Sequence, residues 1–332
     1  MNATRQTGRG VPPVAATGAG PPAPIDGRKV AWISAGALAV FVGLRLLPTG
    51  TNLSHMDFRV EARDTNAIEF CDPLNPQFIP VVAARSPVTM TLGTGGPATM
   101  GSEYRGVVTL RTGSAKPVAP EDLLVVHTRS LHLLIVDPTL TDYQHVHPVP
   151  GKNPGEWTFS FLPQRGGLYR IFADFTPVAT GRGLYASVDL PVGPVAAGGA
   201  KVQANRPAAA TVVEKNDCRF SLVAAEQPMR AGAIIDLRFS LVAVSGGAVP
   251  LQPVMGAFAH LVAFDETRSG FAHLHPTETD LLKPLDAQHP VLKFKLTIPQ
   301  RGRYVIWAQV NLGGREVFVP FWFEVFSASG GK

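Results

Sequence analysis

The chain has 332 residues, 45% of them hydrophobic and 17% charged, which is enough for two core-bearing domains and additional segments. The formal net charge of +5 comes from basic residues scattered along the sequence, with no cluster of Lys and Arg interleaved with aromatic residues. We therefore exclude nucleic acid as a partner.

The N-terminal part of the sequence predicts a tail and a membrane anchor. Residues 1–29 are rich in Gly, Ala, Pro and Thr and predict a disordered cytoplasmic tail. Residues 30–47 are apolar with no charge before Arg45, and their length is the minimum for one transmembrane helix. Basic residues directly precede this run, so we expect a single pass through the cytoplasmic membrane with the N-terminus inside. The bulk of the chain would then be periplasmic or otherwise extracytoplasmic.

A cleaved signal peptide is the alternative for the same apolar run. Its charged region would be unusually long, and the residues that follow (LLPTGTNLSHM) contain no A-x-A-like cleavage site. We therefore favour an uncleaved anchor.

The remaining sequence reads as strands separated by turns. Residues 51–85 include CDPLNPQFIPVV and predict an extended Pro-rich arm that packs across the first domain. Residues 86–192 hold about eight short apolar runs, one of them LLVVH at Leu123, which is typical of a β-sandwich. Residues 193–210 predict a flexible linker, and residues 211–326 repeat the series with an inserted loop that carries His289. The predicted fold class is all-β, with two tandem immunoglobulin-like β-sandwich domains after one N-terminal transmembrane helix.

The two cysteines, Cys71 and Cys218, lie far apart and form no C-x-x-C motif. Neither a redox motif nor a zinc knuckle is indicated. They can pair in an oxidising compartment, but we favour unpaired or structural roles.

One histidine pattern occurs in both domains: His, twelve residues, His, one residue, His, Pro. The second copy lies 128 positions after the first, and the two copies use six of the nine histidines. A second similarity, PQRGGLYRIFADF from Pro163 and PQRGRYVIWAQV from Pro299, supports a tandem repeat. The six histidines are His132, His145, His147, His260, His273 and His275.

The pattern predicts a β-hairpin whose three histidines converge. A loop centred between Thr139 and Leu140 sets His132 opposite His147, because facing residue numbers in an antiparallel pair have a constant sum. Side chains alternate along a strand, so His145 shares a face with His147. The same arithmetic sets His260 opposite His275 in the second copy.

Three converging imidazoles suit a metal ion, and copper and zinc are the usual choices. Five residues before the leading His stand His127 in the first copy and Met255 in the second. An exchange of His and Met is tolerated better by copper than by zinc, which makes copper the first choice and zinc the second. On a regular strand this odd offset would place both side chains on the opposite face. Asp174, with Gln309 as its counterpart, is a further candidate.

A structural role for the histidines stays open. A His before Pro often closes a strand, a buried His can satisfy both ring nitrogens within the fold, and duplication copies fold-critical residues as readily as ligands. The carboxylates Asp137 and Asp265, five residues after the leading histidines, are most simply turn formers.

The motifs HLLIVDPTLTDYQHVHP and HLVAFDETRSGFAHLHP, each followed by its PQRG segment, resemble those of largely uncharacterised bacterial exported or membrane-anchored proteins. The resemblance covers roughly residues 86–326 and implies H…HxHP β-sandwich modules presumed to handle metals. A looser similarity is to periplasmic copper-resistance β-sandwich proteins, although this chain lacks their Met-rich runs.

These observations lead to one hypothesis and two alternatives. The hypothesis is a membrane-anchored extracytoplasmic protein with one three-His copper site per domain, acting in metal binding, sensing or delivery, with an envelope protein as a possible partner. The first alternative is a structural or partner-binding module of the cell envelope. The second is a metalloenzyme that uses an open coordination position, which is less favoured because no acid or base stands beside the histidines in sequence.

Overall fold

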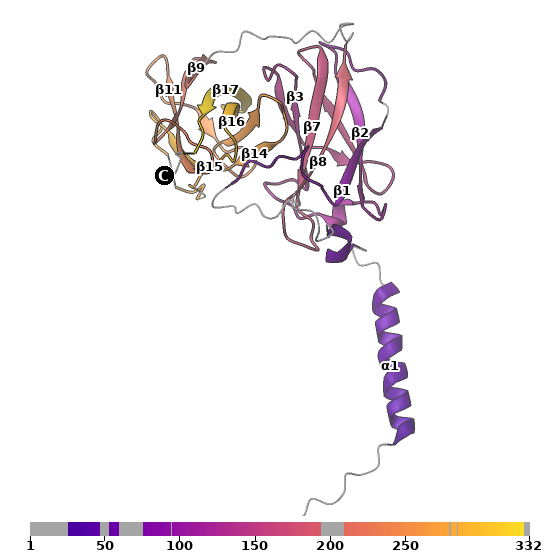
Figure 1. Cartoon of the computed structure of the whole chain (residues 1–332). Helices are drawn as coiled ribbons and strands as arrows, with labels where there is room; N and C mark the ends of the chain where they lie inside the picture. The colour runs from indigo at the N-terminus through magenta and orange to yellow at the C-terminus, as the bar shows by residue number, and fades with distance from the viewer. Residues whose placement is uncertain are drawn as a thin grey trace, which may run out of the picture. The chain divides into compact units, whose positions relative to one another are not determined.

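The protein is described by a computed structural model (Figure 1). It divides into two compact units, residues 1–49 and residues 50–332. The described residues are 26–46, 53–59, 76–93, 95–193, 209–278, 280–283 and 285–328.

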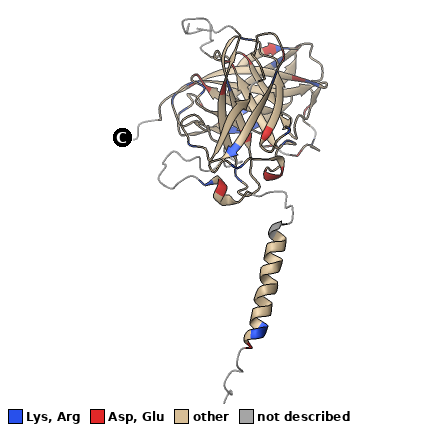
Figure 2. Ribbon diagram, turned by 90° about the vertical axis from the view of Figure 1, so that its right-hand side faces the viewer, with Lys and Arg blue, Asp and Glu red and all other residues tan. Residues whose placement is uncertain are grey.

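The first unit contains helix α1 (Gly27–Leu46). Residues 27–44 are long and apolar enough to cross a membrane, a test that a signal sequence near an N-terminus also passes. In Figure 2 the middle of the helix is tan, and basic residues stand at its N-terminal end. The helix begins before the expected boundary at residue 30, because Arg28 and Lys29 continue its first turn. Residues 1–25, the greater part of the expected tail, lie outside the described residues.

The first domain is a sandwich of two antiparallel sheets. Its outer sheet has the order β1-β2-β6-β5, and its inner sheet has the order β4-β3-β7-β8. Two short 3-10 helices, η1 (His55–Phe58) and η2 (Pro120–Asp122), flank these strands. The strands are β1 (Val88–Gly93), β2 (Tyr104–Thr112), β3 (Leu131–Val136), β4 (Tyr143–Val146), β5 (Val149–Pro150), β6 (Glu156–Phe161), β7 (Gly167–Phe175) and β8 (Leu184–Val192).

The second domain repeats this arrangement. Its outer sheet has the order β15-β11-β10-β9, and its inner sheet has the order β12-β16-β13-β14, with β17 also paired to β16. The strands are β9 (Val212–Lys215), β10 (Cys218–Ala224), β11 (Ile234–Ala243), β12 (Leu251–Gln252), β13 (His260–Asp265), β14 (Phe271–Leu274), β15 (Val291–Thr297), β16 (Gly302–Leu312) and β17 (Arg315–Val325).

The prediction of an all-β fold with two repeated immunoglobulin-like sandwiches is confirmed by these sheets. Most of the apolar runs became strands, because alternating side chains bury one face of each outer sheet and leave the other to solvent. The run at Leu123 is an exception. Residues 123–127 are a loop with isolated bridges at Leu123 and Val126, so the prediction of a strand there is wrong.

The two inner sheets pack against each other, and this contact was not predicted. Along β3, Leu133 and Ile135 face the core of the first domain, while Leu134 and Val136 belong to a third core between the domains. This third core includes Phe172 of β7 and Phe264 of β13, whose rings stack with centroids 6.0 Å apart. The described part of residues 50–332 therefore has four sheet layers in the order outer, inner, inner, outer.

The segment before the first domain contacts both domains. Leu53 and Phe58 lie in the core of the first domain, as expected for an arm across it. Phe78 lies in the core of the second domain, and the backbone of Ile79 exchanges hydrogen bonds with that of Phe271. The expectation that the whole arm packs on the first domain is wrong, because Phe78 lies in the core of the second domain, and Ile79 and Val81 lie in the core between the domains.

Phe264→Ala tests the core between the domains. This side chain is fully buried, so its removal should lower the free energy of unfolding by about 3–5 kcal/mol. Phe326→Ala removes the same atoms from a side chain that is 44% exposed, so it should lower the free energy of unfolding much less. Denaturant unfolding of both variants is the measurement, and equal losses would contradict burial of Phe264 between the sheets.

Candidate metal centre

The hairpin β3–β4 has the register that brings the first three histidines together. Leu133 pairs with Val146 and Leu134 with His145, which continues to His132 opposite His147, as the sequence predicted. One ring nitrogen from each of His132, His145 and His147 lies within 4.8 Å of the others. We call this set the first triad.

The second hairpin, β13–β14, repeats the register. Leu261 pairs with Leu274, which continues to His260 opposite His275. Ring nitrogens of His260, His273 and His275 also lie within 4.8 Å of one another, and we call this set the second triad. Both triads are therefore geometrically able to bind a metal ion.

The turns of the two hairpins depend on the carboxylates that the sequence indicated as turn formers. Asp137 accepts hydrogen bonds from the backbone N–H groups of Thr139, Thr141 and Asp142. Asp265 accepts equivalent bonds from its own turn. This prediction is confirmed, since each carboxylate fixes the loop length on which the register depends.

The two triads lie beside each other. The ring centroid of His273 is 5.3 Å from that of His145 and 5.8 Å from that of His132, and His145 is 6.3 Å from His260. The histidine pattern predicted one separate site in each domain. Packing of the inner sheets instead gathers both triads into one cluster between the domains.

Hydrogen bonds fix which ring nitrogen carries a proton in two histidines of the first triad, His132 and His145. The Nε2 of His132 lies 3.0 Å from the backbone oxygen of Val126, so Nε2 donates and Nδ1 keeps its lone pair. The Nδ1 of His145 lies 2.8 Å from Oε1 of Gln309, whose amide is oriented by donating from Nε2 to Glu316. The Nδ1 of His145 therefore donates, and its Nε2 keeps a lone pair.

The contact between these two rings is consequently a contact between two acceptors. The Nδ1 of His132 and the Nε2 of His145 are 3.0 Å apart. Two lone pairs at this distance repel unless a proton or a metal cation lies between them. The first triad thus has the donor arrangement of a cation site.

The second triad has the same protonation pattern. The Nε2 of His260 lies 3.0 Å from the backbone oxygen of Val254, which leaves its Nδ1 as an acceptor. The Nδ1 of His273 lies 3.0 Å from the Asp174 carboxylate, which leaves its Nε2 as an acceptor. Each triad therefore offers Nδ1 of its leading His and Nε2 of its second His.

Four ring nitrogens in the two triads are buried and have no hydrogen-bond partner among the described residues. They are Nε2 of His147, Nδ1 of His260, Nε2 of His273 and Nε2 of His275. A buried polar atom without a partner costs about 1–3 kcal/mol, so native proteins rarely keep several in one place. Three imidazole nitrogens that point to a common centre fit the donor set of copper or zinc.

Asp174 and Gln309, which the sequence ranked as further candidates, hold the histidines of the opposite domain. Asp174 lies on β7 of the first domain and binds His273 of the second. Gln309 lies on β16 of the second domain and binds His145 of the first. Such outer partners orient a ligand ring and tune its basicity. The crossing over between domains was not predicted.

His127 reaches the second triad although it belongs to the first domain. A tight turn closed by Val126 and Arg129 gives His127 a φ of 49° and redirects the chain, so the strand argument for an opposite face does not apply. Its ring stacks on His275 with centroids 3.6 Å apart. Met255 has the same φ of 49° in the equivalent turn. His127 does not belong to the ligand groups of the two triads.

Burial keeps the cluster neutral. Desolvation lowers the pKa of His145, His273 and His275 well below the ordinary histidine value, and neighbouring imidazoles lower it further. The pKa of His147 falls to about 4 and that of His260 to about 3, again mainly through desolvation. Neutral rings are the form that binds a metal.

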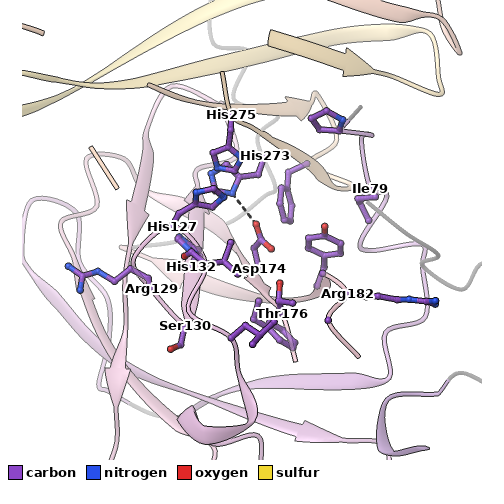
Figure 3. Close-up of a pocket in the computed structure, with 18 of the residues that line it drawn as sticks. Ile79, His127, Arg129, Ser130, His132, Asp174, Thr176, Arg182, His273 and His275 are labelled. Atoms are coloured by element: carbon purple, nitrogen blue, oxygen red, sulfur yellow. Dashed lines mark hydrogen bonds and ion pairs between the residues drawn. The ribbon is translucent and has the colours of Figure 1, made fainter. Parts of the chain in front are cut away.

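A cavity of about 770 Å³ leads to one side of the cluster. His127, His132, His273 and His275 line it together with Asp174. Figure 3 shows these side chains gathered at one end, while Arg129 and Arg182 extend away from them. The cavity therefore borders His132 of the first triad and His273 and His275 of the second.

The cysteines take no part in this cluster as far as the structure describes them. Cys218 is buried in the core of the second domain, and burial raises the pKa of its thiol. Cys71 lies outside the described residues.

A family described as a domain of unknown function (DUF8832) matches the chain twice, over residues 83–192 and residues 212–327. The chain belongs to this family. Each match covers one histidine hairpin of the DUF8832 protein, in agreement with the tandem repeat predicted from the H…HxHP pattern. The match carries no link to copper-resistance proteins.

Several solved structures are similar to the DUF8832 protein. The filamin domain of Lin-41 has 15% identity and a TM-score of 0.19, covering 31% of this chain and 90% of its own. The adhesin FdeC of Escherichia coli has 14% identity and a TM-score of 0.22, covering 73% and 63%. A DUF4785 family protein of Legionella pneumophila has 7% identity and a TM-score of 0.23, covering 70% and 55%.

The DUF8832 protein thus spans less than two thirds of the length of the adhesin and of the Legionella protein. At these TM-scores the similarities support no argument, and the fold assignment rests on the sheets described above. No curated protein matches the chain.

The neutral buried histidines make the metal-free protein sensitive to acid. Their folded-state pKa values lie below the ordinary value of 6.5, so the unfolded chain binds more protons as the pH falls below about 6.5. Stability should therefore decrease from pH 6.5 toward pH 4, where His147 begins to accept a proton in the folded state as well. The raised pKa of Asp174 has the opposite effect on stability at low pH. Asp174 is a single group, however, whereas six histidines favour the unfolded chain as the pH falls.

Denaturant unfolding in the presence of a chelator, at steps between pH 7.5 and pH 4.5, measures this effect. The expected loss is a few kcal/mol. A midpoint that stays constant from pH 7.5 to pH 4.5 would contradict burial of the histidines in their neutral form.

Proposed function

We propose that this DUF8832 protein is an extracytoplasmic metal-binding protein that holds one copper ion in each histidine triad. The observation that carries the proposal is the convergence of buried imidazole nitrogens, several without a hydrogen-bond partner, on two centres. The proposed ligands are Nδ1 of His132 and His260 and Nε2 of His145, His147, His273 and His275.

The protonation pattern supports ligands rather than fold-maintaining histidines. A structural His normally satisfies both ring nitrogens. Here one nitrogen of each leading and second His is satisfied by an oxygen atom, while the other points to the triad. This is the usual arrangement around metal-bound imidazoles, in which the second nitrogen donates to a carbonyl or carboxylate group.

The donor set favours copper over other divalent metals. Imidazole suits copper, zinc, iron and nickel, and among these Cu(II) binds nitrogen donors most tightly in the Irving–Williams order. Three neutral donors in a buried site also suit Cu(I), because a monovalent ion is easier to desolvate than a divalent ion. Zinc is the second candidate.

We propose uptake and release of metal, in sensing or delivery, as the role of the site. The cavity beside His127 and His132 supports this role, since it gives metal a route to the cluster and gives a donor or acceptor protein in the envelope a place to exchange it. Neutral rings need no deprotonation, so binding at neutral pH releases few protons.

We propose that α1 anchors the protein in the cytoplasmic membrane, with the β-sandwiches outside. Its length, its apolar composition and the basic residues Arg28 and Lys29 at its N-terminal end support this orientation.

Titration of the metal-free full chain with Cu(I), Cu(II) and Zn(II) tests the metal proposal. We expect two equivalents of copper per chain in protein purified without a polyhistidine tag. His145→Ala combined with His147→Ala should remove one equivalent, because one donor cannot hold the ion against chelator competition. Stoichiometry by calorimetry or by chelator competition is the readout.

His289→Ala is the matched control for that titration. His289 is exposed on the inserted loop, so its loss should leave both equivalents in place. Absence of stoichiometric binding, or binding that survives the double substitution, would reject the metal proposal and favour histidines that maintain the fold.

Fractionation of cells tests the anchor. We expect the intact chain in the membrane fraction after alkaline carbonate washing, and release of the protein when residues 27–46 are deleted. An N-terminus that begins after residue 46 in the mature protein would identify α1 as a cleaved signal sequence instead.

A further inference from the structure

The two triads have different outer partners at equivalent positions. Asp174 pairs with His132 across β3 and β7, and Gln309 pairs with His260 across β13 and β16. The repeat thus places a carboxylate in one domain where it places an amide in the other. Each side chain reaches a histidine of the opposite domain, as described above.

The difference changes the charge beside each triad. Asp174 accepts a hydrogen bond from Nδ1 of His273, and its side chain is only 18% exposed, so its charge acts through a poorly screened environment. A carboxylate in this position makes the imidazole a stronger donor and offsets the charge of a bound cation.

The first triad has a neutral partner instead. Gln309 accepts from His145 through an amide oxygen. The nearest carboxylate in this chain of hydrogen bonds is Glu316, one step further away and exposed to solvent. Solvent screens that charge. Asp174 acts on His132 through space only, and the cation Arg129 acts on both His132 and His147.

We propose that the two triads form one asymmetric two-metal centre in which the second triad, through Asp174 of the first domain, binds Cu(II) more tightly than the first triad does. This inference rests on the metal-binding function proposed above. The expected difference in Cu(II) affinity is about 10-fold to 100-fold, which is the usual effect of an outer-shell partner. The first triad, whose hydrogen bonds go to a backbone oxygen and an amide oxygen, is the better site for Cu(I).

Each triad is measured alone in a full chain that lacks the other. His145→Ala with His147→Ala leaves the second triad, and His273→Ala with His275→Ala leaves the first. Chelator competition gives the affinity of each variant for Cu(II) and for Cu(I), and circular dichroism checks that each variant keeps its β-structure.

Asp174→Asn then tests the connection between the domains. The amide keeps an acceptor oxygen for His273 and removes only the charge. Although Asp174 is the strand neighbour of His132 in the first triad, its substitution should weaken Cu(II) binding about 10-fold to 100-fold at the second triad and much less at the first. Cu(I) affinity should change less than Cu(II) affinity, whereas a misfolded variant would lose both.

The reciprocal variant adds a charge to the first triad. Gln309→Glu combined with Glu316→Gln exchanges the two groups, keeps their hydrogen bond and leaves the net charge unchanged. It should raise the Cu(II) affinity of the first triad by at least tenfold.

The outcomes separate this inference from the proposed function. Failure of both single-triad chains to bind copper would reject the metal-binding function itself. Equal Cu(II) affinities of the two chains would reject the asymmetric centre but not the metal-binding function. The same holds if Asp174→Asn lowers the Cu(II) affinity of the first triad.

Discussion

Two hydrogen bonds that cross between the domains, from His145 to Gln309 and from His273 to Asp174, are the interactions on which the candidate site depends. They form only because the inner sheets pack face to face around a core of apolar and aromatic side chains. Each bond fixes one nitrogen of a buried imidazole and aims the other at its triad. Domain packing, ring orientation and donor direction are therefore parts of one arrangement.

The arrangement lowers the stability of the metal-free fold, and a bound cation would restore that stability. Six imidazoles, three of them buried and three half-buried, are kept neutral by desolvation, and four of their nitrogens have no hydrogen-bond partner among the described residues. In a fold without another role for these groups, apolar residues of similar size would pack there more stably. This loss of stability is explained if the same nitrogens coordinate metal, since a bound ion stabilises the folded state that holds it.

Much of the local structure was predictable from the sequence because it follows from periodicity. The spacing between His132 and His147 determined the hairpin register, and Asp137 marked the turn that sets it. The placement of the triads side by side was not predictable by the same reasoning, since strand alternation says nothing about which sheet faces which. One signal was present: LHLLIV in β3 and HLVAF in β13 are apolar on both faces, as strands buried on both sides are.

The turn at His127 and the hydrogen bond from Gln309 to Glu316 could not be predicted from the sequence for a different reason. A positive φ at His127 cannot be read from a residue that is neither Gly nor Asn, yet this turn carries the ring across to His275. The hydrogen bond between Gln309 and Glu316 joins neighbouring strands, and Gln309 also bonds His145, which is 164 positions away from it. Long-range contacts of this kind are set by packing between domains.

Anomalous scattering at the copper edge from crystals of the copper-loaded protein tests the central claim most directly. We predict two copper peaks, one in each triad, bound by Nδ1 of His132 or His260 and by Nε2 of the other two histidines at about 2 Å. A single peak, or peaks only at exposed histidines such as His289, would contradict it.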